Sequence, residues 1–561
     1  LAGASLVASL HKSKDVYKTL EDMEAENRRQ PADKSVRSSQ LYNEVASRHA
    51  MGLEVQAGNV TDTLLRYNSA WMLLSKPLYY LQNLMQNPFM TLPVLMGRFG
   101  TARSSAVMAK TYADVGRVMA GQRLTPDTIK DLPEDIRGVI ADLLNQGRLN
   151  VSLDQEMGER LRGTSIMGRV ITWLQGIAER VEGINRVVAA ATAYRLATER
   201  DYDHRAAVNY AGDIVYDTHG DYSNFNAPKL MRNGPGRIVT QFRKFQLIQI
   251  GLLAKLSREA TKYASPEEKW VARKSMGFLL GTTFAMGGTM ALPGFTAISW
   301  ILGKAFGEDD EPNDPEAIEA RMRQAIGDPD LADLLMQGIP KRFFGVDGQP
   351  VTGGMGEAFS ILPYTKMESF DRSTYENILI GLAGPLIGGT GLRIFEGMGL
   401  IGDGKYSEAA TKVLPTGLAN IVKGVRMKEQ GLTRSTGTEL LSPDEVSDFT
   451  AFMQAIGLRS NEVADTQFLS RVTTGYDAFY RDESKRIRDM YQDAWQSGDR
   501  EAMVEAREQW VEMNQSRMRY GFRPQPLSNL IRAPLERRKY SIESRRDMNR
   551  MNYNLANVRQ P

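Results

Sequence analysis

The 561-residue chain contains no cysteine and only four histidines, His11, His49, His204 and His219. Without cysteine there can be no disulfide, no thiolate zinc site and no cysteine nucleophile. The histidines are scattered and form neither an HxxxH nor an HExxH pair. We therefore expect no metal site and no cofactor.

Sequence signatures of catalysis are also missing. The chain has no phosphate-binding loop ending in GK[ST] and no GxSxG nucleophile elbow. Acidic residues are numerous, but most lie in charged helical faces and linkers, where a solvated role is the common one. We therefore predict no catalytic residue and no enzyme activity. The sequence begins at Leu1 without a secretory signal, so we expect a processed chain or part of a longer protein, whose upstream region could carry a catalytic module.

What is present is ordinary for a folded protein: 42% hydrophobic residues, 24% charged residues and a net charge of +3 at pH 7. These values fit neither a disordered chain nor a polytopic membrane protein. Strand signals are scarce and helical periodicity recurs, which predicts an all-α, elongated, multi-domain protein. We divide it into five regions: an N-terminal helical region (1–125), a helical packing domain (126–265), an apolar segment (266–306), an acidic linker with a second apolar region (307–440), and a C-terminal hairpin with a basic tail (441–561).

Three patterns predict particular helices. Pro77, Pro88 and Pro93 interrupt an apolar, aromatic segment over residues 68–100, which should form helical pieces of about ten residues at most, in a core or at a membrane interface. Residues 482–514 should form a hairpin that turns at residues 497–499. Apolar residues spaced four and three apart predict a coiled-coil seam, within the protomer or between protomers, at Val170, Leu174, Ile177, Val181, Ile184 and Val188.

No charged residue occurs between Lys274 and Lys304. A helix that rises about 1.5 Å per residue can cross a bilayer core of about 30 Å in that length, so the run is membrane-competent. Pro293 and Gly294 split it, however, and a buried hairpin in a helical core would have much the same sequence. The candidate insertion residues are a GxxxG step, two leucines and an aromatic end: Gly277, Leu279, Leu280, Gly281, Trp300 and Ile301.

A second glycine-rich apolar stretch covers residues 378–392 and repeats the GxxxG spacing at Gly384 and Gly388. A single spanning helix needs about 20 residues, so this stretch is too short to cross a bilayer, and Pro385 interrupts it. It is predicted to be either a re-entrant membrane element or a buried core hairpin.

The C-terminal tail is strongly basic. From Arg517 onward it carries eleven basic residues against three acids, with aromatic residues such as Tyr520 and Phe522 between them. Such a tail can bind DNA phosphates without sequence preference, or dock on an acidic protein surface. The candidate binding residues are Arg537, Arg538, Lys539, Arg545 and Arg546.

Several segments of the chain together resemble a known group, the large internal virion or DNA-ejection proteins of tailed bacteriophages. The resemblance is closest to their C-terminal region called the PLxRFG domain. In place of the motif that names this domain, the chain has Leu95-Met96-Gly97-Arg98-Phe99-Gly100, which keeps Arg-Phe-Gly but lacks Pro-Leu. The matching segments are SKPLYYLQNLMQNPFMTLPVLMGRFG, ERVEGINRVVAAATAYRLA, DYSNFNAPKLMR to QFRKFQ, KVLPTGLANIVKGVRMKEQGLTRSTG and AFMQAIGL.

The resemblance implies a protein stored inside the capsid near the portal and expelled through the tail. In the host envelope such proteins form a conduit across the periplasm and the inner membrane. The implied partners are further copies of the chain in a ring or tube, the portal and other internal virion proteins, phage double-stranded DNA and the host inner membrane. Two alternatives stay open: a static internal scaffold, and part of a peptidoglycan-degrading lytic transglycosylase, although no residues here match that enzyme's catalytic glutamate motif.

Overall fold

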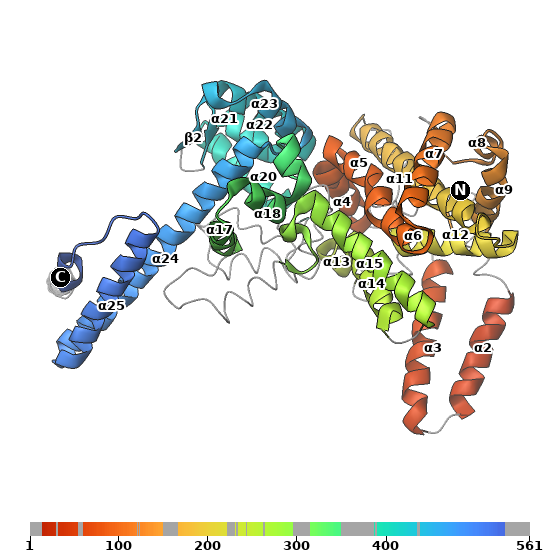
Figure 1. Cartoon of the computed structure of the whole chain (residues 1–561), viewed down its shortest axis with the longest axis horizontal. Helices are drawn as coiled ribbons and strands as arrows, with labels where there is room; N and C mark the ends of the chain where they lie inside the picture. The colour runs from red at the N-terminus through yellow and green to blue at the C-terminus, as the bar shows by residue number, and fades with distance from the viewer. Residues whose placement is uncertain are drawn as a thin grey trace, which may run out of the picture. The chain divides into compact units, whose positions relative to one another are not determined.

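The computed structural model describes residues 14–29, 32–53, 60–119, 122, 124–149, 166–220, 231, 234–242, 244–261, 264–295, 315–348, 386, 390–434 and 438–532. Within these ranges the chain is almost entirely helical, as predicted (Figure 1). The regular β-structure of the described residues is a short antiparallel pair, β1 (Leu432–Thr433) with β2 (Glu439–Leu441). The all-α class is therefore confirmed.

The chain divides into two compact units, and neither is continuous in sequence. The first unit consists of Leu1–Ala297 with Asp328–Thr466, and the second of Ile298–Gly327 with Gln467–Pro561. The five sequence regions stay a prediction.

The largest core of the first unit surrounds the C-terminal half of α11 (Ile166–Thr198). Val187 and Val188 begin a stretch of this helix in which Ala189, Ala190, Ala191 and Ala193 are fully buried. Because alanine side chains are short, neighbouring helices can pack close to the α11 backbone. The neighbours are α7 (Thr101–Met119), α9 (Glu134–Asn145) and α12 (His204–His219).

Of the residues in the predicted coiled-coil seam on α11, Val188 is fully buried and the others are not. Val170 is exposed, and the seam residues from Leu174 to Ile184 are only partly buried. The line that faces the interior of the unit runs one position further on and includes polar residues: Ile171, Gln175, Ala178, Glu182 and Asn185. Apolar spacing alone pointed to the wrong line because it treats these buried polar residues as surface.

The proline-containing segment is divided as predicted only at Pro77, because helical backbone continues through Pro88 and Pro93, where the helix changes between π and α. The pieces are short. They are α4 (Val60–Ser69), the π-helix η1 (Ala70–Leu74), α5 (Pro77–Leu84), the π-helix η2 (Asn87–Thr91) and α6 (Leu92–Phe99). Pro77 occupies the first turn of α5, where its missing N–H costs nothing. Leu74, Met90 and Leu95 are buried, so this segment belongs to the core of the first unit.

The uncharged run begins within α15 (Pro266–Gly287), which packs against α6 and α14 (Lys244–Thr261). The Ser265 hydroxyl caps its N-terminus by accepting a bond from the amide of Glu268 at 3.2 Å. The helix ends at Gly288, whose φ of 64° is a conformation that favours glycine. The short 3-10 turn η4 (Thr289–Ala291) follows and packs against α18 (Pro329–Phe344).

The remaining helices of the first unit lie in its N-terminal and C-terminal parts. Near the N-terminus, α2 (Lys14–Arg29) packs on α3 (Ala32–Leu53). The helices α20, α21 and α22 follow one another and pack in that order, and α23 packs on α22. The bounds not yet given are α8 (Pro126–Lys130), α13 (Gly234–Val239), α20 (Leu392–Gly402), α21 (Tyr406–Val413), α22 (Thr416–Gln430), η8 (Pro443–Glu445) and α23 (Asp448–Ile456).

The second unit is built on a helical hairpin of α24 (Asn461–Ser497) and α25 (Arg500–Arg519) (Figure 1). A third helix, α17 (Pro315–Ile326), contributes Ala317 to the core of this unit. The turn is where the sequence predicted it, at Gly498 with φ 74°, and Asp499 caps α25. Alternating three- and four-residue steps on α25 bury Ala506, Trp510 and Met513 against α24, as in an antiparallel coiled coil.

Candidate functional site

Four of the predicted insertion residues lie on α15, where they do not share one face. Leu279 is fully buried in a cluster with Met90 and Leu252, and Leu280 is partly buried. Gly277 and Gly281 are exposed, and a methyl group added to either would meet no atom within 4 Å. In this structure the GxxxG step therefore borders open space, and the leucine beside it belongs to the core.

None of the described helices is both long enough and apolar enough to cross a membrane. The other predicted site residues lie outside the described residues: Trp300, Ile301, Gly384, Gly388, Arg537, Arg538, Lys539, Arg545 and Arg546.

The helix that follows the second apolar stretch, α20, places its two charged residues against α21. Arg393 donates a hydrogen bond to the carbonyl of Thr411 at 2.9 Å, and Lys412 donates to the Glu396 carboxylate at 2.8 Å. Both charged residues of α20 are thus engaged by α21. Large apolar side chains face outward instead, with 72% of Phe395, 56% of Met398 and 45% of Ile401 exposed.

The neighbouring helix α22 has a similar arrangement, with small residues inside. Gly417 and Gly424 leave no room for a side chain, because a methyl group there would overlap the carbonyl of Ser75 and stand 2.6 Å from that of Ala451. The large apolar side chains of α22 are exposed. Together with the exposed apolar side chains of α20 and α23 they are called the outward apolar residues: Phe395, Met398, Ile401, Leu418, Ile421, Val425, Phe449 and Phe452.

Hydrophobic periodicity could not identify the outward apolar residues. A helical pattern of large apolar residues normally predicts the core face. In α22 the lines of large and small residues are offset by a single position, and the small line is the one that packs. The only signal in the sequence is the spacing of Gly417, Asn420 and Gly424, which permits close helix approach.

A charged cluster, the Glu182 cluster, is sealed inside the first unit. Glu182, Arg186 and His219 are each at most 3% exposed. The Arg186 Nε donates to Glu182 Oε1 at 2.8 Å, and a guanidinium NH2 donates to the Gly220 carbonyl at 2.9 Å. His219 Nδ1 lies 3.6 Å from Glu182 Oε1. A substrate has no access to this cluster, so its role is to hold α11 and the end of α12 together.

Hydrogen bonds from η2 fix the His219 ring. The Asn87 amide donates to the Asn185 carbonyl at 3.0 Å, which turns its oxygen toward His219. That oxygen accepts from Thr91 at 2.8 Å and from His219 Nε2 at 2.9 Å. The network therefore assigns the imidazole proton to Nε2.

Burial and charge act on this cluster in opposite directions. Burial lowers the pKa of His219, and Glu182 only partly opposes this, so the ring is held neutral. Burial alone would raise the pKa of Glu182, but Arg186 outweighs this through its charge and its hydrogen bond and holds that pKa below its usual value. The four-residue spacing of Glu182 and Arg186 is the one feature of the sequence that points to this cluster.

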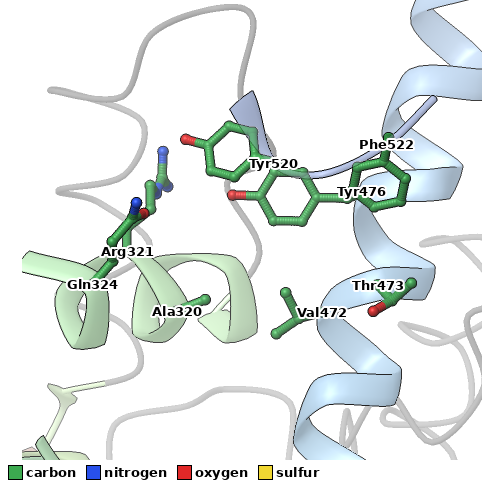
Figure 2. Close-up of a pocket in the computed structure, with 8 residues that line it drawn as sticks. All are labelled: Ala320, Arg321, Gln324, Val472, Thr473, Tyr476, Tyr520 and Phe522. Carbon is green, nitrogen blue, oxygen red and sulfur yellow. The ribbon is translucent and has the colours of Figure 1, made fainter. Parts of the chain in front are cut away.

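The second unit contains a half-open pocket of about 130 Å³ (Figure 2). It lies between α17, α24 and the segment after α25, and its lining is aromatic and basic. The Tyr476 and Tyr520 rings lie 4.6 Å apart by their centroids, and Arg517 lies over the Tyr480 and Phe522 rings at 5.2 and 5.8 Å. The pocket is lined by Ala320, Arg321, Gln324, Val472, Thr473, Tyr476, Tyr520 and Phe522.

Among the described residues, no group of three or more acidic, histidine or cysteine side chains is placed to hold a metal ion. Comparison of the chain with protein-family models, with curated proteins and with solved structures finds no match. The resemblance to phage ejection proteins is therefore carried by the segments quoted from the sequence, and stays a prediction.

Proposed function

We propose that the chain is an internal virion protein of a tailed phage, stored near the portal and expelled to help form a conduit for DNA across the host envelope. The observation that carries this proposal is α20, where Arg393 and Glu396 bond to α21 while Phe395, Met398 and Ile401 are exposed. Large exposed apolar patches mark surfaces that another partner covers. A lipid surface is the partner that the proposal assigns to the outward apolar residues.

The charges near this face support a lipid partner. Lys405 and Tyr406 follow α20 after Asp403 and Gly404, and Lys423, Arg426 and Lys428 lie on α22, where Arg426 pairs with Glu408 at 3.6 Å and Lys428 with Asp448 at 3.1 Å. Tyr406 is 70% exposed, and tyrosine rings favour the boundary between lipid tails and water. An apolar face flanked by basic residues suits an anionic membrane surface.

Other features of the first unit suit a protein that adopts more than one packing. The segment from α4 to α6 changes between π- and α-helix and contains three prolines, so several of its backbone bonds are not those of a continuous helix. The Glu182 cluster is a buried ionic group, which a different packing could open to water. Elements with two alternative arrangements are what switching proteins use.

The proposal includes the partners and places that the resemblance implies. Further copies of the chain would assemble into a ring or tube beside the portal and the other internal proteins, inside the capsid. After ejection the chain would occupy the host periplasm and inner membrane, and its basic tail would contact double-stranded DNA through the phosphates.

Dye release from vesicles containing anionic lipid tests the proposal. We expect the chain to release dye, and Phe395→Asp and Ile421→Asp to abolish most of the release, since a carboxylate is disfavoured in lipid. Both positions are exposed, so folding should survive, whereas a charge at the buried Leu279 would also damage the core. Leu469→Asp on α24, equally exposed, is the matched control and should release dye as the parent does.

Two outcomes would contradict the proposal. If the chain never releases dye and is not crosslinked to lipid during infection, the static scaffold is the better description. If it clears peptidoglycan in a zymogram, the cell-wall enzyme replaces it.

A further inference from the structure

The pocket of the second unit has the size of one six-membered ring. Its volume is about 130 Å³, and a cavity of about 150 Å³ holds one benzene molecule. The rings of Tyr476, Tyr520 and Phe522 lie along one side, and the short apolar side chains of Val472 and Ala320 lie on another (Figure 2). A flat aromatic group could enter with its face against a tyrosine ring.

The opposite side of the pocket is polar. Arg321 and Gln324 of α17 lie there, and the hydroxyl ends of Tyr476 and Tyr520 point toward that side (Figure 2). A guanidinium supplies only donors, whereas an amide and a hydroxyl supply both donors and acceptors. This combination matches the edge of a heterocycle that carries carbonyl and N–H groups, such as a nucleobase.

Two of the lining rings have arginines beside them in the sequence. Arg519 and Arg523 are exposed and stand next to Tyr520 and Phe522 in the sequence. The carboxylate of Glu319 on α17 is paired with Arg323 at 2.8 Å, so it does not offset these arginines fully. Aromatic rings with arginines beside them are the usual means of binding single-stranded nucleic acid, through stacked bases and neutralised phosphates.

We propose that this pocket binds one pyrimidine base of single-stranded DNA. The base stacks on Tyr520, its edge meets Arg321 and Gln324, and the adjacent phosphates lie near Arg519 and Arg523. The site uses the first residues of the basic tail, around Tyr520 and Phe522, and differs from the proposed duplex contact because it requires an unpaired base. It does not rest on the proposed function, because it requires neither a membrane nor a virion.

Fluorescence anisotropy with a labelled oligothymidylate tests the proposal. The sharp comparison is an abasic oligonucleotide of the same length, which has the same phosphates but no bases. At one fixed salt concentration the basic tail contributes equally to both, so the ratio of the two affinities reports the base alone. We expect the full chain to bind the oligothymidylate about tenfold more tightly.

Variants then locate the effect. Tyr520→Leu should reduce the ratio to about one, whereas Tyr520→Phe should keep most of it, because stacking needs the ring and not the hydroxyl. Gln324→Ala should reduce it in part. Tyr216→Leu, at an exposed tyrosine of the first unit, is the control and should leave the ratio unchanged.

Three results would overturn the proposal. One is equal affinity for the oligothymidylate and the abasic strand. A second is a preference for bases that survives Tyr520→Leu with helical content intact. The third is displacement of the oligonucleotide by an aromatic peptide with no nucleic-acid specificity, which would make the pocket a protein-docking site.

Discussion

Gly97 of α6 lies directly against Ser275 of α15. A methyl group at Gly97 would overlap the Ser275 hydroxyl and stand 2.7 Å from its amide nitrogen. The same hydroxyl donates to the Val94 carbonyl at 3.0 Å, so the two helices cross backbone to backbone. Next to the glycine, Arg98 pairs with Glu268 at 2.7 Å and Phe99 is buried in the core. The Gly-Arg-Phe segment thus joins α6 to α15.

Gly97→Ala should therefore destabilise the first unit. Backbone atoms of α15 stand in the way, and they cannot move aside as a flexible side chain can. Overpacking of this kind costs about 1–3 kcal/mol, and we expect the upper part of that range. Urea unfolding followed by circular dichroism would measure it. Gly116→Ala on α7, where a methyl group meets nothing within 4 Å, should not lower stability.

Gly277→Ala and Gly281→Ala should have the opposite effect. Both glycines are exposed inside a helix and have no neighbour within 4 Å of an added methyl group. Each replacement should stabilise α15 by about 0.5–1 kcal/mol, because alanine loses less backbone entropy than glycine. If a second helix packs on this GxxxG step in lipid, the same variants should lower dye release from vesicles. Lower stability in water would show that the step is already covered.

Acid should destabilise the first unit through the Glu182 cluster. The pKa of His219 is lowered on folding, so the unfolded state binds more protons below the usual histidine value near 6.5. Stability is therefore complete above that pH and falls as the pH drops toward the folded-state pKa. The lowered pKa of Glu182 adds a further loss below about pH 4.5.

The measurement is the free energy of unfolding at pH 7.5 and pH 5.5. His219→Gln keeps a donor for Asn87 but cannot take up a proton, so it should flatten the difference between the two values. His204→Gln on the exposed side of α12 is the matched control and should keep the parental difference. A parental chain with no loss of stability between these pH values would refute the assignment.

Trp510 and Val511 of α25 offer a paired test of the hairpin. Trp510 is 1% exposed and fills the interface with α24, whereas Val511 is 50% exposed. Trp510→Ala should cost about 3–5 kcal/mol, and Val511→Ala should stay within about 0.5 kcal/mol. Thermal unfolding of the two variants measures the difference. Similar losses at both positions would mean that Val511 is covered by a partner in solution.

The sequence predicted where some helices begin and turn better than it predicted which face of a helix is buried. Pro77 correctly marked the start of α5, because proline fixes φ, and Gly498 marked the hairpin turn, because glycine readily adopts positive φ. Pro88 and Pro93 lie within continuing helical backbone instead. The interior line of α11 was missed, since Glu182 and Asn185 are buried only through partners distant in the sequence. The aromatic pocket was equally out of reach, because α17 and α24 are separated by more than a hundred residues.

The uncharged run shows which part of the structure the sequence could not predict. In the uncharged run, the sequence could not distinguish Leu279 from its neighbour Leu280, although one is fully buried and the other is not. Burial depends on the crossing of α6 and α15 at Gly97, which no local pattern encodes.

The glycine line of α22 has a consequence for how this chain can diverge over evolutionary time. Gly417 and Gly424 have no room for substitution, so drift on this helix is confined to its other positions. If only water ever touched Leu418, Ile421 and Val425, natural variants would soon carry lysine, glutamate or serine there. If natural variants keep these three positions apolar while other exposed positions change, selection must act through a partner that covers them.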